Sequence, residues 1–268
     1  MKYKLLAVDM DGTLLNDASI ITERTREAVL AAIGRGVLFV PSTGRPMGGL
    51  RQVCALFDFD LPMVLFNGAM AMTAKSNRVL FEQGLDFSCA EVIFTQGVRR
   101  GFSVIAWAGE TLFASRENEE VTTYRRITGA EVHVIADARP MQQLGITKML
   151  WIIPPEEAAR LQAEMLELLG DKVNCHTSQP YLLEFVDAGA SKGRALEAVG
   201  AAYGIAREEM IAVGDGWNDV SMLEYAGLGV AMGNAPEEIR GMCRDVTLSN
   251  NEDGVAKVIE KYILRGDI

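Results

Sequence analysis

The chain has 268 residues, 49% of them hydrophobic and 23% charged, an ordinary composition for a globular protein of one or two domains. Its 36 acidic and 26 basic residues give a net charge of −10, which argues against nonspecific binding to nucleic acid or an anionic membrane, because both need a basic surface. No run of about 18 apolar residues is present to span a membrane.

Two histidines are too few for a multi-histidine metal site. The cysteines form no CxxC motif and favour a reducing cytoplasm; they are Cys54, Cys89, Cys175 and Cys243.

The first third of the chain alternates short apolar strands with helices. Residues 5–8 form a continuous apolar run, as in a strand buried on both faces of a parallel sheet. Thr22 is placed to cap a helix that runs to about Ile33. A strand, a helix and a strand are expected next, at residues 37–40, 47–57 and 62–66. This order predicts right-handed parallel crossovers and an α/β fold.

The same alternation returns in the last third, and the middle differs. Near the end, we expect helices at 191–203, 218–226, 236–243 and 253–263 and strands at 210–213, 228–232 and 246–248. The middle predicts short strands at 102–107, 111–114, 131–135, 148–153, 172–176 and 182–186, with helices at 87–99 and 156–169. That pattern is typical of a mixed or antiparallel sheet with helices on one face. We therefore predict a discontinuous core of residues 1–82 and 188–268, interrupted by an inserted domain of residues 83–187.

Polar segments follow three predicted strands of the core. They are Asp9-Met10-Asp11-Gly12-Thr13, Ser42-Thr43-Gly44-Arg45 and Gly214-Asp215-Gly216-Trp217-Asn218-Asp219. Ligands of open parallel sheets bind outside the carboxyl ends of the strands, so these segments predict one shared site. An ionised Asp9 can act directly as a nucleophile, and a partner such as Asp11, if its pKa is raised, can act as general acid and then general base. The alternative is a solvated turn with a capping aspartate.

Asp215 and Asp219 bring two further carboxylates to the predicted site. Like charges about 4 Å apart repel by about 4 kcal/mol at an effective dielectric constant near 20, so converging carboxylates require a cation. Oxygen ligands without histidine or cysteine favour Mg²⁺. The alternatives are a Gly-Asp-Gly turn for Asp215 and a first-turn helix residue for Asp219.

Four other residues are candidates to hold a phosphate. Thr43 and Gly44 offer a hydroxyl and an approachable backbone N–H after a strand. Lys192, in Ser191-Lys192-Gly193, can neutralise phosphate oxygens and the nucleophile, although a lysine near a helix start is often a surface residue. Asn218 can donate to phosphate or cap its helix.

Together these residues resemble the four motifs of the haloacid dehalogenase-like hydrolases. The motifs are Asp9-Met10-Asp11-Gly12-Thr13, Thr43-Gly44-Arg45, Lys192 and Gly214 to Asp219. The large insertion is similar to that of the Cof-type phosphatases, as are Asn67-Gly68-Ala69 and Asn250-x-Glu252-Asp253-Gly254-Val255-Ala256. The resemblance implies a doubly wound, Rossmann-like core with an inserted α/β cap domain, and a Mg²⁺-dependent phosphatase.

The resemblance also implies a role for each motif residue. Asp9 would be the nucleophile and a metal ligand, and Asp11 would bind the metal through its carbonyl and act as acid and base. Asp215 would complete the metal site, with Asp219 binding through water or supporting the ligands. The phosphoryl group would be held by the backbone N–H of Met10 and by Thr43, Gly44, Lys192 and Asn218.

The substrate is less determined than the reaction. We expect a small phosphorylated metabolite, preferably a sugar phosphate, with FMN or pyridoxal phosphate as the alternative. Candidate specificity residues in the inserted domain are Trp107, Tyr124, Arg125, Arg126, His133, His176 and Tyr181.

Other functions are alternatives. Phosphoryl transfer as in the related phosphomutases stays open, as do the role of Trp217 and a monomeric or oligomeric state. A non-catalytic phosphate sensor is disfavoured because every motif residue is present. A nucleotide-binding oxidoreductase is disfavoured because Gly227-x-Gly229 with Gly233 matches G-x-G-x-x-G poorly.

Overall fold

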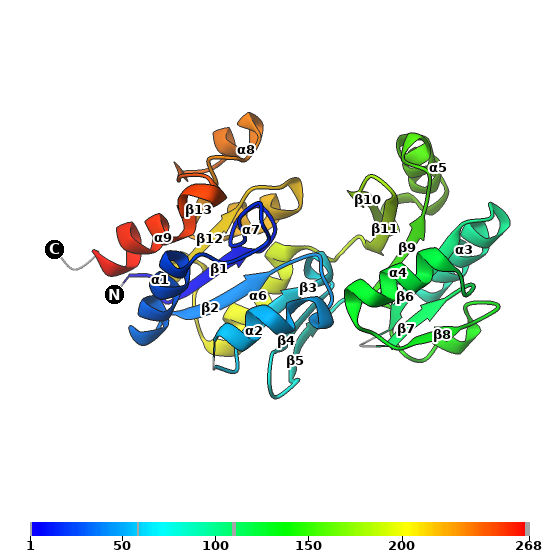
Figure 1. Cartoon of the computed structure of the whole chain (residues 1–268), viewed down its shortest axis with the longest axis horizontal. Helices are drawn as coiled ribbons and strands as arrows, with labels where there is room; N and C mark the ends of the chain where they lie inside the picture. The colour runs from blue at the N-terminus through cyan, green and yellow to red at the C-terminus, as the bar shows by residue number, and fades with distance from the viewer. Residues whose placement is uncertain (1, 58, 109–110, 266–268) are drawn as a thin grey trace. The chain divides into compact units, whose positions relative to one another are not determined.

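A computed structural model describes residues 2–57, 59–108 and 111–265 of the chain (Figure 1). Its packing forms two compact units. The first comprises residues 1–43, 52–81 and 191–268, and the second comprises residues 44–51 and 82–190. The domain boundaries expected from the sequence placed residues 44–51 in the core, whereas these residues group with the second unit. Within the described ranges, no helix combines the length and apolar character needed to cross a bilayer.

The first unit contains an eight-stranded sheet in the order β14-β13-β12-β1-β2-β3-β4-β5. Its strands are β1 (Leu5–Asp9), β2 (Leu38–Ser42), β3 (Pro62–Leu65), β4 (Met70–Thr73), β5 (Val79–Glu82), β12 (Met210–Gly214), β13 (Leu228–Ala231) and β14 (Asp245–Val246). Neighbours from β14 to β3 are parallel, and β4 returns antiparallel to β3. The sequence did not predict β4 and β5, because Met-Ala-Met-Thr has weak strand propensity and β5 is largely exposed.

Helices cover both faces of this sheet. They are α1 (Glu23–Gly34), α2 (Arg51–Leu56), α6 (Lys192–Tyr203), α7 (Val220–Tyr225), α8 (Glu237–Met242) and α9 (Gly254–Ile259). Leu5 and Ala7 share a buried cluster with residues of α6 and α7, while Leu6 and Val8, which alternate with them, are buried as well. Helix α1 packs against α9, and α6 packs against α7. The prediction of a doubly wound parallel core is therefore confirmed.

The second unit is built on a six-stranded sheet in the order β10-β11-β9-β6-β7-β8. Its strands are β6 (Ser103–Ala108), β7 (Thr111–Ala114), β8 (Val132–Val134), β9 (Lys148–Ile152), β10 (Val173–Gln179) and β11 (Leu182–Asp187). The strand pairs are antiparallel except for β7 with β8. Helices α3 (Phe87–Arg99) and α5 (Ala158–Leu169) pack with one face of the sheet around Trp151 and Phe185.

One helix of the second unit contradicts the expectation that all helices lie on one face. Helix α4 (Glu119–Thr128) was not predicted, because it is a strongly polar segment in which only Val121 and Thr128 are buried. The indole of Trp107 donates to the Tyr124 hydroxyl of α4 at 3.1 Å. Trp107 alternates with Ala106 and Ala108, which belong to the core beneath α3. Helix α4 therefore covers the opposite face of the sheet.

The sheet of the first unit brings the polar segments to one edge. Strand β1 lies between β12 and β2, with Val8 opposite Val213 and Asp9 opposite Ser42. The three strands thus end at the same level, and the segments that follow them share the carboxyl edge of the sheet.

Candidate active site

Asp9 is the last residue of β1, and the chain folds back directly after it. Its side chain is buried, and the Leu14 N–H donates to the Asp9 carbonyl at 3.1 Å. The turn passes through Gly12 at φ +83°, where a Cβ would lie 2.5 Å from Oδ2 of Asp215. Glycine is therefore required for the turn to approach Asp215. The Asp11 side chain, within the same turn, is exposed.

Lys192 connects two of the predicted segments. It is the first residue of α6, whose N-terminus is capped by the Ser191 hydroxyl. Its ammonium is fully buried and donates to Oδ1 of Asp9 at 2.5 Å and to Oδ1 of Asp219 at 2.6 Å. Burial lowers the pKa of Lys192, but the charges of Asp219 and Asp9 outweigh it and leave the pKa raised. Lys192 is therefore charged at neutral pH and joins these two carboxylates.

Asp219 fixes the turn that carries Asp215. Its buried Oδ2 accepts the backbone N–H groups of Asp215 and Gly216 at 3.0 and 2.9 Å. Oδ1 of Asp215 in turn accepts the Thr13 hydroxyl at 2.6 Å. One carboxylate thus shapes its own loop and binds Lys192, while Thr13 ties that loop to the turn after β1.

Asp9, Asp215 and Asp219 form a cluster that can hold a cation. One oxygen from each lies within 4.8 Å of the others. Burial, followed by the charge of Asp219, raises the pKa of Asp9 well above its ordinary value. Burial is also the main reason why the pKa of Asp215 rises to about 6. Three carboxylates facing one lysine leave an excess of negative charge, and this all-oxygen set fits a hard divalent cation such as Mg²⁺.

The cluster differs in one member from the ligand set expected from the sequence. That set was Asp9, Asp11 and Asp215, with Asp219 in support. The side-chain cluster contains Asp219, and the carboxylate of Asp11 is not one of its members. The expected contact of Asp11 uses its carbonyl, which stays a prediction.

Asn67 brings two of the phosphate candidates together. Its backbone N–H donates to the carbonyl of buried Thr43 at 3.0 Å, and its Oδ1 accepts the Asn218 amide at 3.0 Å. Phe66, Asn67 and Gly68 all have positive φ. A Cβ on Gly68 would fall on the backbone of Ser191 and Lys192. This turn therefore fits closely against the start of α6 and places Thr43, Asn218 and Lys192 in one region.

The remaining two phosphate candidates are placed less directly. Met10 is buried after Asp9, and its carbonyl accepts the Leu15 N–H at 2.8 Å. Gly44 follows Thr43 but groups with the second unit, where its carbonyl accepts Lys148 Nζ at 3.3 Å. Their roles in binding phosphate stay predictions.

Sequence reasoning missed Thr13, Asn67 and Asn234 as structural members of the site. The Asn234 amide donates to the Gly12 carbonyl at 2.8 Å and so supports the turn after β1. Asn234 follows β13, so the same carboxyl-edge argument that selected Asp215 would have found it. Asn67 entered the sequence interpretation only through the family resemblance, because nothing in its local pattern indicates a contact with Asn218.

The second unit groups some of the candidate specificity residues. Lys148 and Glu184, which the sequence did not single out, form a buried ion pair at 2.8 Å. His176 lies 3.6 Å from the other oxygen of Glu184. Burial and the charge of Glu184 raise the pKa of Tyr124 despite Lys148, so these side chains share one environment. The other candidates, Arg125, Arg126, His133 and Tyr181, are exposed.

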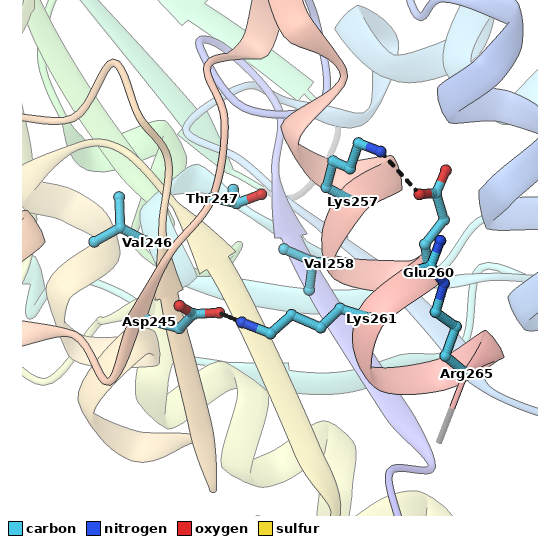
Figure 2. Close-up of a pocket in the computed structure, with 8 residues that line it drawn as sticks. All are labelled: Asp245, Val246, Thr247, Lys257, Val258, Glu260, Lys261 and Arg265. Carbon is cyan, nitrogen blue, oxygen red and sulfur yellow. Dashed lines mark hydrogen bonds and ion pairs between the residues drawn. The ribbon is translucent and has the colours of Figure 1, made fainter. Parts of the chain in front are cut away.

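A surface pocket of the first unit lies elsewhere and contains none of the predicted site residues. Figure 2 shows its lining: Asp245, Val246, Thr247, Lys257, Val258, Glu260, Lys261 and Arg265. Lys261 pairs with Asp245 at 2.7 Å and Lys257 with Glu260 at 3.2 Å. These charges satisfy one another, so we assign the chemistry to the carboxylate cluster.

Comparison with known proteins supports the family resemblance of the four motifs over nearly the whole chain. A family model described as haloacid dehalogenase-like hydrolase matches residues 6–259. YxeH of Bacillus subtilis, provisionally named as a phosphatase, is 32% identical over 98% of this chain and 99% of its own. The 5-amino-6-(5-phospho-D-ribitylamino)uracil phosphatase YwtE of the same organism is 29% identical over 97% of this chain and 98% of its own.

Solved structures have the same fold. A haloacid dehalogenase-like hydrolase from Bacteroides thetaiotaomicron superposes with a TM-score of 0.86 at 30% identity, covering 98% of this chain and 100% of that one. The subclass IIB sugar phosphatase BT4131 superposes with a TM-score of 0.82 at 25% identity, and the match covers 97% of this chain and 98% of that one. The resemblance indicated by the four motifs is thereby confirmed.

Proposed function

Because the chain belongs to the haloacid dehalogenase-like hydrolases, we propose that this phosphatase is Mg²⁺-dependent and hydrolyses small phosphomonoesters, sugar phosphates foremost, through an aspartyl-phosphate on Asp9. The observation that carries the proposal is the cluster of Asp9, Asp215 and Asp219, whose oxygens lie within 4.8 Å of one another with Lys192 bound to two of them. A structural ion pair would need one carboxylate for one lysine, so the excess acidic groups point to a bound cation, which together with Lys192 would offset the negative charge of a phosphoryl group.

We assign the steps of the reaction to the two aspartates of the first motif, in the roles that the family resemblance implies. Lys192 binds Oδ1 of Asp9, so we assign Oδ2 as the nucleophile that attacks phosphorus. The bond from phosphorus to the ester oxygen breaks, and Asp11 gives that oxygen its proton. Asp11 then takes a proton from water, whose oxygen attacks the phosphorus of the intermediate. Inorganic phosphate leaves and the Asp9 carboxylate is restored.

The same residues would hold the metal and the phosphoryl group. Asp9, Asp215 and the Asp11 carbonyl would bind Mg²⁺, with Asp219 in support. When bound, Mg²⁺ neutralises carboxylate and phosphoryl charge. Lys192 supplies the protein's own cation. The Met10 N–H, Thr43, Gly44 and Asn218 would orient the phosphoryl oxygens; the link from Asn67 to Asn218 and Thr43 supports this assignment for two of them.

Removal of the metal tests the proposal directly. Treatment with EDTA should stop hydrolysis of p-nitrophenyl phosphate, and added Mg²⁺ should restore it. Circular dichroism of the treated protein should show an intact fold, because the apolar clusters of both units do not depend on a metal. Hydrolysis that continues at full rate after chelation would contradict the cation assignment.

Two observations bear on the substrate. The likeness to the sugar phosphatase BT4131 supports sugar phosphates. The similarity to YwtE, named for a substrate that carries a phosphorylated ribityl chain on a uracil ring, supports a heterocyclic phosphate such as FMN or pyridoxal phosphate as the second candidate. Phosphate release across a panel of sugar, nucleotide and vitamin phosphates should give the highest kcat/KM for a sugar phosphate.

Phosphoryl transfer is tested with the same panel. Each substrate is assayed with and without an added sugar acceptor. For a hydrolase, the phosphate released should account for the substrate consumed in both assays. A new phosphorylated sugar formed only with the acceptor would favour the phosphomutase-like alternative.

A further inference from the structure

Trp217 is the one tryptophan of the chain that faces solvent. The indoles of Trp107 and Trp151 are buried, with 2% and 0% exposure, and each takes part in the core of the second unit. Trp217 is 62% exposed. An exposed apolar side chain is common in itself, so a function for Trp217 has to be argued from its position in the fold.

That position is the turn between the metal cluster and the phosphate candidates. Trp217 opens the 3-10 turn Trp217–Asp219, two residues after Asp215. The buried carboxylate of Asp219 holds the backbone N–H groups of Asp215 and Gly216, and Asn218 is tied to Asn67. The backbone on both sides of Trp217 is thus fixed beside the reacting groups, while the indole contributes little to the core.

The surroundings of Trp217 favour a small ligand over a protein partner. Its neighbours Gly216 and Asn218 are partly or fully exposed and are not apolar. Large contiguous apolar patches mark protein-binding surfaces, and the residues next to Trp217 in the sequence, a glycine and an asparagine, add no apolar surface to the indole. A single ring, by contrast, is the right size to stack on one flat face of a ligand.

We propose that the indole of Trp217 stacks on a ring of the substrate's leaving group and so selects ring-bearing phosphomonoesters. The inference rests on the proposed function, because it needs the phosphoryl group at the carboxylate cluster. The proposal requires the leaving group to extend from the phosphoryl group past the turn that carries Trp217. A sugar ring and a heterocycle both present a flat face to an indole, whereas an acyclic leaving group presents none.

Kinetics on matched substrates test the proposal. Glucose 6-phosphate and FMN are the ring-bearing substrates, and glycerol 3-phosphate is the acyclic one. Trp217→Ala should lower kcat/KM for a ring-bearing substrate by about 5- to 160-fold, the range found when an aromatic that stacks on a nucleic-acid base is removed. The same variant should change kcat/KM for glycerol 3-phosphate by less than about twofold, and Trp217→Phe should retain most of the ring preference. A larger loss with FMN than with glucose 6-phosphate would assign the heterocycle, and the reverse would assign the sugar.

A control variant separates stacking from a general effect of removing an exposed aromatic. Phe59 is also exposed and precedes β3, at the amino end of the sheet. Phe59→Ala should leave the ratio of ring-bearing to acyclic kcat/KM unchanged. An equal loss with every substrate in Trp217→Ala would assign a structural role, and no loss with any substrate would remove Trp217 from the site.

Fluorescence gives a readout that does not depend on turnover. Because the other two tryptophans are buried, acrylamide quenching reports mainly on Trp217. In the Asp9→Asn variant with Mg²⁺, glucose 6-phosphate should reduce quenching, while glycerol 3-phosphate and inorganic phosphate should not. Equal protection by all three would overturn the stacking assignment. If no phosphate ester is hydrolysed by the wild-type protein, the proposed function fails, whatever the quenching shows.

Discussion

The two units of this protein each bury a lysine among polar groups, and the two sites are built differently. In the first unit, Lys192 binds Asp9 and Asp219, and Asp215 lies in the same cluster. In the second unit, Lys148 pairs with the carboxylate of Glu184 at 2.8 Å. Both lysines are almost fully buried, with 0% and 2% exposure.

Charge balance is what separates the two sites. Burial lowers the pKa of Lys148, but Glu184 and Tyr124 outweigh it, so the pair stays ionised and its charges cancel. Burial lowers the pKa of His176, which keeps that neighbour neutral at pH 7. The first site instead has more carboxylates than cations, and burial together with the charge of Asp219 raises the pKa values of Asp9 and Asp215. A balanced site is complete by itself, whereas an unbalanced one is built to receive a cation.

The largest effect is expected at the unbalanced site. Asp9→Asn should lower kcat for p-nitrophenyl phosphate by about 10³-fold or more, because the nucleophile is lost at nearly constant shape. Stability should change little, since Lys192 keeps Asp219 and the buried charge of Asp9 is itself unfavourable. Steady-state kinetics and urea unfolding measure the two outcomes. Retention of more than a few per cent of the activity would remove Asp9 from the nucleophile's role.

The balanced site should give the largest change in stability. Glu184→Gln leaves Lys148 buried without its carboxylate, which should lower the free energy of unfolding by about 3–5 kcal/mol. Urea unfolding of this variant and of Asp9→Asn compares the two sites directly. If Asp9→Asn proves the more destabilising of the two, the distinction by charge balance is wrong.

A double replacement is the matched control for the balanced site. Lys148→Met with Glu184→Leu removes both charges and keeps apolar volume. It should be near neutral or stabilising, by up to about 4 kcal/mol, because the desolvation of both ions is avoided. A double variant as unstable as Glu184→Gln would mean that the loss comes from packing and not from an unpaired charge.

The smallest effect is a pH dependence of opposite sign at the two sites. The pKa of Asp215 is about 6 in the folded protein and near 3.9 when unfolded, so the folded state takes up protons first as pH falls. Its contribution to stability without metal therefore improves as pH falls from 7.5 through 6. The pKa of His176 is lowered on folding, so its contribution is lost as pH falls through about 6.5.

Melting temperatures in EDTA at pH 7.5 and 5.5 test this contrast. Relative to wild type, Asp215→Asn should raise the melting temperature more at pH 7.5 than at pH 5.5. His176→Gln should raise the melting temperature more at pH 5.5 than at pH 7.5. Each variant differs from wild type at one titrating group, so the effects of the other titrating groups cancel when the variant's melting temperature is compared with that of wild type. The assignment is contradicted if both variants gain more melting temperature at the same one of the two pH values.

Much of the fold followed from the sequence where the local pattern was strong. The apolar run of β1, the Thr22 cap of α1 and the Ser191 cap of α6 are all present, because each depends on neighbouring residues only. Helix α4 and strands β4 and β5 were missed. Helix α4 is largely polar and β5 is largely exposed, so contacts with the rest of the fold stabilise them.

The sequence by itself determined which side chains gather at the carboxyl edge of the first unit's sheet. Carboxylates and a lysine placed at strand and helix ends must meet at one sheet edge once the strands are parallel neighbours. Only the tertiary structure decided which of them touch: Lys192 with Asp9 and Asp219, Thr13 with Asp215, Asn67 with Asn218. It also decided that Lys148 and Glu184 pair across the second sheet. Those contacts join residues up to 202 positions apart, and their distances are set by strand order and side-chain packing, which no local pattern encodes.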